Sequence, residues 1–194
     1  MKQVSLSGSP RENVGKKDAG SLRREGKIPC ILYGGKEQVS FTIVEQQLNK
    51  IVFSPDVYQV NLDLNGKVVR AILKDAQFHP VTDKVMHADF IELVAGKAIR
   101  VALPLHVEGN SPGVARGGTK VVHFRKITVM GAPENLPEQI VCDISKLDIG
   151  DKIRVADLNQ GVLQVLEAPS AVVVAITESR ASRKAAETAA PGKK

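Results

Sequence analysis

Residues 57–75, VYQVNLDLNGKVVRAILKD, contain two runs of alternating apolar and polar residues on either side of an Asn-Gly pair. Alternation with a period of two is typical of a strand that buries one face, because successive side chains of a strand point to opposite sides. Asn65 and Gly66 both tolerate positive φ, which the type I′ turn of a two-residue hairpin requires. The segment therefore predicts a β-hairpin with strands over 57–64 and 67–75.

Strand-like patterns extend from this hairpin in both directions along the chain. Upstream, we expect strands over 2–7, 28–33 and 39–43, with short helices inside 17–26 and 44–53. Downstream, residues 85–93 are expected to form a strand with Val85, His87, Asp89 and Ile91 on one face. Further strand-like runs cover residues 98–107, 119–130, 139–145, 151–158 and 171–177. The sequence therefore predicts a mainly β protein with short helices.

The chain is expected to divide into two domains and a tail. We interpret VAGK at 94–97 as the hinge, because strand-like runs lie on both sides of it. This interpretation gives an N-terminal domain over 1–94 and a C-terminal all-β domain over 95–178. Residues 179–194 are basic and have no apolar periodicity, which predicts a disordered tail.

Positive charge is concentrated near the two ends of the chain. Residues 1–37 contain eight Lys or Arg and four Asp or Glu, whereas residues 38–177 contain fourteen and fifteen. The last segment, 178–194, has five basic and two acidic residues. Such local excesses attract polyanions, either nucleic acid or an anionic membrane.

The sequence favours a cytoplasmic location. It contains no run of about 18 apolar residues that would span a membrane, and its first residues lack the apolar run of a signal peptide. Cys30 and Cys142 are its only cysteines, and both lie in apolar, strand-like runs. We interpret them as buried free thiols rather than as a disulfide.

No set of residues suggests catalysis or a metal site. The sequence has neither a nucleophile elbow nor a phosphate-binding glycine loop, and GVARGG at 113–118 lacks the spacing and the Lys-Ser/Thr pair of a P-loop. His87 and Asp89 are two apart on one strand, which is too few ligands for a metal. They either reach a partner or solvent, or form a hydrogen-bonded pair inside the protein.

A basic, glycine-rich segment is the strongest candidate for binding. Six Lys or Arg residues fall within 11–27, and four glycines lie among or beside them. Lys and Arg neutralise phosphates, and glycine lets a backbone approach a surface closely. The alternative is a basic loop that only faces solvent.

Two runs carry a resemblance to a known family. Residues 11–37, RENVGKKDAGSLRREGKIPCILYGGKE, and 73–93, LKDAQFHPVTDKVMHADFIEL, resemble the signatures of the bacterial Ctc family of general-stress and ribosomal proteins, counted as number twenty-five of the large subunit. The spacing between the runs matches as well. The C-terminal half, with ALPLHVEGNSPGVARGG and LPEQIVCDISKLDIGD, resembles the long, two-domain form.

The resemblance implies a structural component of the large ribosomal subunit rather than an enzyme, with no cofactor. It implies an N-terminal β-barrel-like domain that binds the loop E region of 5S ribosomal RNA in the central protuberance. It also implies a C-terminal all-β domain that faces other components there. The implied RNA contacts are Arg11, Lys16, Arg23, Arg24, Tyr33, Gln77, His79, His87 and Asp89. Tyr33 could also be a strand-end aromatic that covers the barrel.

Two other functions stay open at this point. The anticodon-binding part of glutaminyl-tRNA synthetases is similar in fold to this family, so the chain could bind tRNA, although it has no synthetase catalytic motif. It could instead be a protein–protein adaptor active in stress, working through its C-terminal domain.

Overall fold

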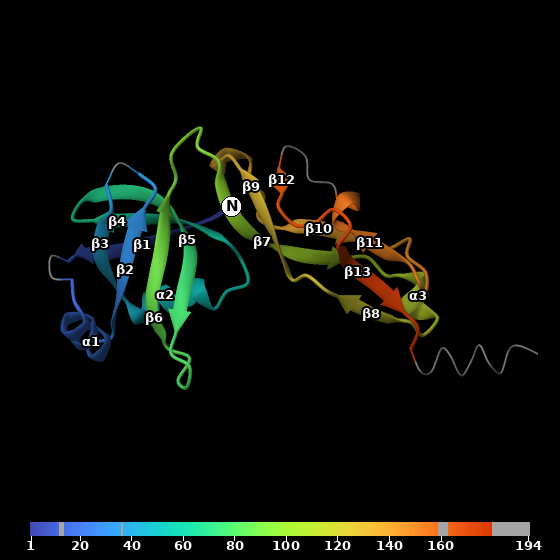
Figure 1. The fold of residues 1–194 in the computed structure, drawn as a ribbon, viewed down its shortest axis with the longest axis horizontal. Helices are drawn as coiled ribbons and strands as arrows, with labels where there is room; N and C mark the ends of the chain where they lie inside the picture. Colours follow the sequence, from blue (N-terminus) through green and yellow to red (C-terminus); the bar gives the residue numbers. More distant parts are fainter. Residues whose placement is uncertain (12–13, 36, 159–162, 180–194) are drawn as a thin grey trace, which may run out of the picture. The chain divides into compact units, whose positions relative to one another are not determined.

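The computed structural model describes residues 1–11, 14–35, 37–158 and 163–179. The tail expected over 179–194 lies outside this range from residue 180 onward. The described chain divides into two compact units, Met1–Val101 with Gly131–Glu138, and Ala102–Met130 with the described residues from Gln139 onward. Each unit is built mainly of strands, which confirms the predicted fold class (Figure 1).

The first unit contains a closed six-stranded barrel, which confirms the barrel implied by the resemblance. Its strands are β1 (Lys2–Pro10), β2 (Lys27–Tyr33), β3 (Val39–Val44), β4 (Tyr58–Leu64), β5 (Lys67–Phe78) and β6 (Val85–Glu92), in the spatial order β1-β3-β2-β6-β5-β4. Helix α1 (Lys16–Arg24) follows β1, and α2 (Glu45–Val52) follows β3. The β4–β5 hairpin has the predicted turn, with φ of 53° at Asn65 and 86° at Gly66.

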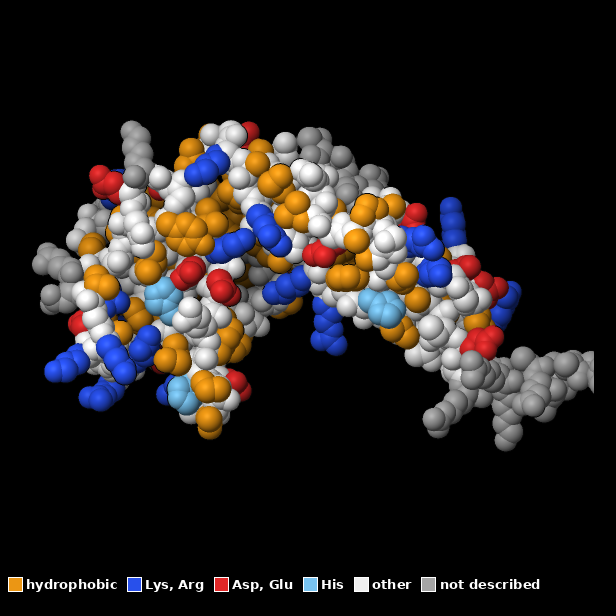
Figure 2. Space-filling model, viewed as in Figure 1, with side chains coloured by type: hydrophobic (Ala, Val, Ile, Leu, Met, Phe, Trp, Pro, Cys, Tyr) orange, Lys and Arg blue, Asp and Glu red, His pale blue; other side chains and the backbone are white. Residues whose placement is uncertain are grey.

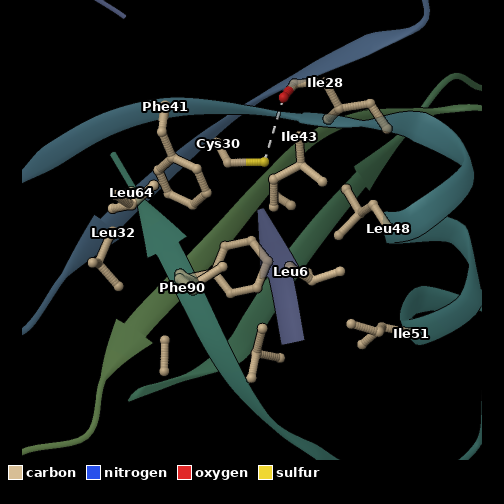
Figure 3. Close-up of a cluster of buried hydrophobic side chains, with 14 of the residues drawn as sticks. Leu6, Ile28, Cys30, Leu32, Phe41, Ile43, Leu48, Ile51, Leu64 and Phe90 are labelled. Carbon is tan, nitrogen blue, oxygen red and sulfur yellow. Dashed lines mark hydrogen bonds between the residues drawn. The ribbon is translucent and has the colours of Figure 1, made fainter. Parts of the chain in front are cut away.

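The barrel interior is filled by aliphatic side chains around two aromatic rings (Figure 3). The rings of Phe41 and Phe90 are fully buried, with their centroids 5.7 Å apart. From α2, Leu48 and Ile51 point into the same cluster. Cys30 also lies here as a free thiol, and burial raises its pKa to about 12. Cys142 in the second unit is likewise buried and free, so the interpretation of both as buried thiols is confirmed.

Two irregularities alter the predicted strands. β5 continues to Phe78, although the predicted strand ended at residue 75. The β5–β6 register skips Met86, because Gln77 pairs with His87 and Phe78 with Val85. This bulge turns Val85 into the core beside Ala88 and Phe90. The expectation that Val85 shares a face with His87 and Asp89 is therefore wrong.

The strands beyond the barrel form two small sheets, which lie mostly in the second unit. One has the order β10-β7-β9-β12, formed by β7 (Ile99–Glu108), β9 (Lys126–Gly131), β10 (Ile140–Asp143) and β12 (Gln164–Val165). The other has the order β11-β13-β8, formed by β8 (Thr119–Val122), β11 (Lys152–Arg154) and β13 (Val172–Thr177). The run expected as one strand over 119–130 is thus divided between the two sheets. The second unit also contains helix α3 (Pro112–Ala115) and the 3₁₀ helix η2 (Val155–Asp157), whereas the 3₁₀ helix η1 (Pro133–Asn135) belongs to the first unit.

Gly8 lies where β1 changes partner. The strand pairs with β4 in parallel from Lys2 to Gly8 and with β3 in antiparallel fashion at Ser9 and Pro10. A Cβ atom at Gly8 would lie 2.8 Å from Cδ2 of Phe41 and 2.9 Å from Cδ2 of Leu64. Both side chains are buried, so little space exists for them to move away.

We therefore predict that Gly8→Ala lowers the free energy of unfolding by about 1–3 kcal/mol, the usual cost of overpacking a core. Gly20→Ala is the matched control, because a Cβ there meets nothing within 4 Å and residue 20 lies inside α1. That change should raise stability by up to about 1 kcal/mol, since alanine favours helix. Urea unfolding of the three proteins measures both effects. Equal stability of wild type and Gly8→Ala would contradict the close approach.

Candidate nucleic-acid interface

The outer face of β2, β6 and β5 brings several predicted contact residues together. Ala88 and Phe90 of β6 are fully buried, so His87 and Asp89, which alternate with them along the strand, point outward. In the antiparallel β5–β6 register, Gln77 lies directly opposite His87. In the parallel β2–β6 register, Tyr33 lies opposite Ile91, two residues beyond Asp89.

His87 and Asp89 form a pair at the surface. Their Nδ1 and Oδ1 atoms are 2.8 Å apart, and the two side chains are 20% and 34% exposed. The imidazole Nδ1–H donates to the carboxylate, which fixes the orientation of the ring. The Nε2 atom makes no hydrogen bond to any residue that the structure describes, so it is available to a ligand.

Asp75 belongs to this surface, although sequence reasoning did not identify it. It lies opposite Asp89 because the β5–β6 register shifts between Leu73 and Asp75. One of its oxygens accepts a hydrogen bond from the backbone N–H of Ala76. The pattern of residues 67–75 contains no sign of that shift, so the sequence had no signal that places Asp75 beside Asp89.

Tyr33 is half-buried beside the two carboxylates. Burial raises the pKa of its phenol, and the nearby charges of Asp89 and Asp75 raise it further. The phenol is therefore protonated at neutral pH and can donate a hydrogen bond. Its position agrees both with a contact residue and with an aromatic at a strand end.

Helix α1 carries the exposed positive charge next to this sheet face. The side chains of Lys16, Lys17 and Arg24 are exposed, and Figure 2 shows Lys and Arg side chains gathered over this helix. Arg23 is different, because its Nε–H donates to the backbone oxygen of Met86 at 2.9 Å. That bond holds α1 against the start of β6, next to the outer face.

Arg11 also has a partner inside the first unit. Its guanidinium lies 2.7 Å from a carboxylate oxygen of Asp18 in α1, and only 12% of its side chain is exposed. The backbone N–H of Arg11 donates to the oxygen of Ser40 in β3. The residue therefore links the helix to the barrel, and less of it faces outward than the sequence suggested.

His79 orders the turn between β5 and β6. Its Nδ1 accepts hydrogen bonds from the backbone N–H groups of Val81 and Thr82, both at 3.3 Å. The backbone N–H of His79 donates to the backbone oxygen of Lys84. Since Arg23 contacts Met86 just beyond this turn, His79 lies at the same end of the barrel as α1.

Matches to known protein families cover nearly the whole chain. Residues 6–90 match the Ribosomal L25p family, and residues 98–180 match the C-terminal domain of ribosomal protein TL5. The chain belongs to the ribosomal L25p family. It is 37% identical to the large ribosomal subunit protein bL25 of Phocaeicola vulgatus, over 97% of this chain and 99% of that one. The bL25 of Amoebophilus asiaticus is also 37% identical, over 100% of both chains. That of Bacteroides fragilis strain YCH46 is 41% identical, over 87% and 86%.

Family membership confirms the resemblance that the two N-terminal runs indicated. It also confirms that the chain is a ribosomal protein rather than an enzyme and that it belongs with the ribosome in the cytoplasm. Among the described residues, no three His, Cys, Asp or Glu side chains gather in a way that could hold a metal ion. Nor does any helix within the described ranges have the length and apolarity needed to cross a membrane.

The pKa of Tyr33 tests whether its phenol lies close to the two carboxylates. In a Tyr58→Phe background Tyr33 is the only tyrosine, since the chain has two. Asp89→Asn should lower its pKa, because a neutral neighbour no longer disfavours the phenolate; Asp75→Asn should lower it less. An absorbance titration of tyrosinate measures the pKa. The control is Glu134→Gln on η1, which should have no effect, and a pKa unmoved by Asp89→Asn would contradict this geometry.

Proposed function

We propose that this protein is a structural constituent of the large ribosomal subunit that binds 5S ribosomal RNA, at its loop E region in the central protuberance. Residues 1–94 form the RNA-binding domain in this proposal, and residues 95–178 face other components of the subunit. The observation that carries the proposal is the joint position of an exposed basic helix and a polar outer sheet face on one barrel.

The two parts of this surface suit two kinds of contact. Lys16, Lys17 and Arg24 are exposed on α1 and would neutralise phosphates, which supplies affinity but little sequence information. The outer face of β2, β6 and β5 is broad and carries Gln77, His87 and Asp89. The minor groove of A-form RNA is wide and shallow, so a sheet face can approach its base edges and 2′-hydroxyls.

The internal contacts assign different roles to the arginines. Arg11 pairs with Asp18, and Arg23 donates to the backbone of Met86, so both hold α1 against the barrel. Any phosphate contact of theirs would come from the remaining N–H groups of the guanidinium, which has five donors. Arg24 and Lys16 are exposed and can turn fully toward RNA. His79 would act through the turn that it orders.

The acidic side chains argue for base recognition rather than for phosphate binding. Asp75 and Asp89 lie opposite each other on the proposed interface, where they would repel phosphates. A carboxylate is favourable there if it accepts a hydrogen bond from an exocyclic amine of a base. Asp89 also orients the ring of His87, whose Nε2 then faces the ligand.

We predict that Lys16→Ala weakens the binding of all RNAs by a similar factor. The loss of one phosphate contact should reduce the slope of log affinity against log salt by about 0.7–0.9. Lys67→Ala is the control, because it removes an exposed charge at the start of β5, beside the Asn65-Gly66 turn. This is the opposite end of the strand from the His79 turn. Titrations of 5S ribosomal RNA at several salt concentrations measure the slopes. If the slope of Lys16→Ala equals that of wild type, Lys16 does not contact phosphate.

Asp89→Ala should lower the affinity for 5S ribosomal RNA by about 1–3 kcal/mol, the scale of a good base contact. Its affinity for tRNA should be unchanged or higher, because a repulsive charge has been removed. Glu134→Ala provides a control that removes an exposed charge from the same unit. Parallel titrations of both RNAs at one salt concentration separate the two effects, and a thermal melt checks the fold. A folded Asp89→Ala protein with undiminished 5S affinity would disprove the role of Asp89, and a wild type that binds both RNAs equally would contradict the proposed function.

A further inference from the structure

Charge is unevenly distributed along the second unit. Residues 109–133 contain four Lys or Arg and no Asp or Glu, whereas residues 139–179 contain three basic and six acidic residues. The basic residues of the first segment are Arg116, Lys120, Arg125 and Lys126, with His123 among them. The near-neutral total for the middle of the chain therefore conceals a positive segment.

Most acidic side chains of this unit have structural partners. Asp143 accepts hydrogen bonds from the backbone N–H and the hydroxyl of Ser145, at 2.9 and 2.6 Å. Asp151 and Asp157 accept from the backbone N–H groups of Asp148 and Arg154. Asp148 pairs with Arg116. Three of these carboxylates therefore accept hydrogen bonds within turns, and the fourth forms an ion pair.

The basic side chains from β8 to the start of β9 have no such partners among the described residues. We call residues 120–126 the β8–β9 connection, and its charged or titratable side chains are Lys120, His123, Arg125 and Lys126. All four are exposed. None of them makes a side-chain hydrogen bond or ion pair with the part of the chain that the structure describes. Figure 2 shows Lys and Arg side chains standing out from the surface over this connection.

The backbone of the connection is nevertheless held in place. The N–H of His123 donates to the oxygen of Val173 in β13, and the oxygen of Arg125 accepts from the N–H of Leu105 in β7, both at 2.9 Å. Lys120 belongs to β8 and Lys126 begins β9, so each end is part of a sheet. Exposed cations on an ordered backbone bind a fixed array of anions with little loss of backbone entropy.

The apolar residues of the connection favour RNA over protein as the occupant. Val121, Val122 and Phe124 are half-buried, so the fully exposed side chains of the connection are Lys120, His123, Arg125 and Lys126. The centre of a protein–protein interface is usually depleted in Lys and rich in exposed aromatic or aliphatic anchors. Closely spaced cations without such anchors match the regularly spaced phosphates of RNA.

We propose that the β8–β9 connection is a second RNA-binding surface, which binds phosphates of ribosomal RNA other than those contacted by the barrel. The inference rests on the proposed function in one respect, namely that the chain is part of the large subunit. It adds a separate contact in the second unit, so the protein would hold RNA at two places.

The test compares two double variants of the full chain. Arg125→Ala with Lys126→Ala removes two charges from the connection, and Lys146→Ala with Lys152→Ala removes two exposed charges elsewhere in the same unit. Each is titrated against large ribosomal subunits prepared without this protein, over a series of salt concentrations, and against isolated 5S ribosomal RNA. Thermal melts confirm that both variants fold.

We expect the connection variant to bind subunits on the order of tenfold more weakly, with the salt slope reduced by about 0.7–0.9 for each lost contact. Its affinity for isolated 5S RNA should equal that of wild type, and the control variant should match wild type in both assays.

Equal losses in the two double variants would overturn the inference. A loss of subunit affinity with an unchanged salt slope would overturn it in favour of a protein partner. A matching loss on isolated 5S RNA would overturn the separateness of the surface. Failure of wild type to bind 5S RNA would refute the proposed function alone, since the subunit assay reads the connection independently.

Discussion

The pairing of β6 with strands on both sides is the constraint on which the rest of the barrel surface depends. β6 runs parallel to β2 and antiparallel to β5, and its Ala88 and Phe90 are fully buried. A slip of one residue would exchange every inward and outward side chain, which the burial of Phe90 forbids. His87 and Asp89 must therefore face outward, with Gln77 and Asp75 as their cross-strand neighbours. The bulge at Met86 gives the strand one further core residue, Val85, and leaves the Met86 oxygen to accept from Arg23.

Local patterns predicted what depends on neighbours in sequence. The Asn65-Gly66 turn and the outward pairing of His87 with Asp89 follow from φ preferences and a period of two, and both are present. The bulges beside Lys74 and Met86 depend on how two strands fit together, and no residue type marked them in advance. They explain why Asp75 was missed and why Val85 was placed on the wrong face. The partner of Arg11 could not be foreseen either, because Asp18 meets it only after α1 folds back against the barrel.

For charge, the position of each side chain in the fold matters more than the net charge of a segment. Counted together, residues 38–177 are close to neutral, with fourteen basic and fifteen acidic residues. The structure separates cations on the β8–β9 connection from carboxylates that accept hydrogen bonds in turns. In and beside α1 the reverse occurs, because Arg11, which precedes the helix, and Arg23, which lies in it, look equivalent to Arg24 in the sequence yet are held by internal contacts. Exposure and partners, which only the fold determines, decide which charges are available to RNA.

Closure of the barrel has a consequence for the protein before it joins the ribosome. An open sheet presents a row of unpaired N–H and C=O groups along each outer strand, onto which a strand of another chain can add. In the described residues, β1 pairs with both β3 and β4, so the six-stranded barrel has no outer strand. A newly made chain waiting for assembly is thereby protected on this side from strand-to-strand aggregation. This protection comes from the topology of the barrel and needs no other molecule to cover a sheet edge.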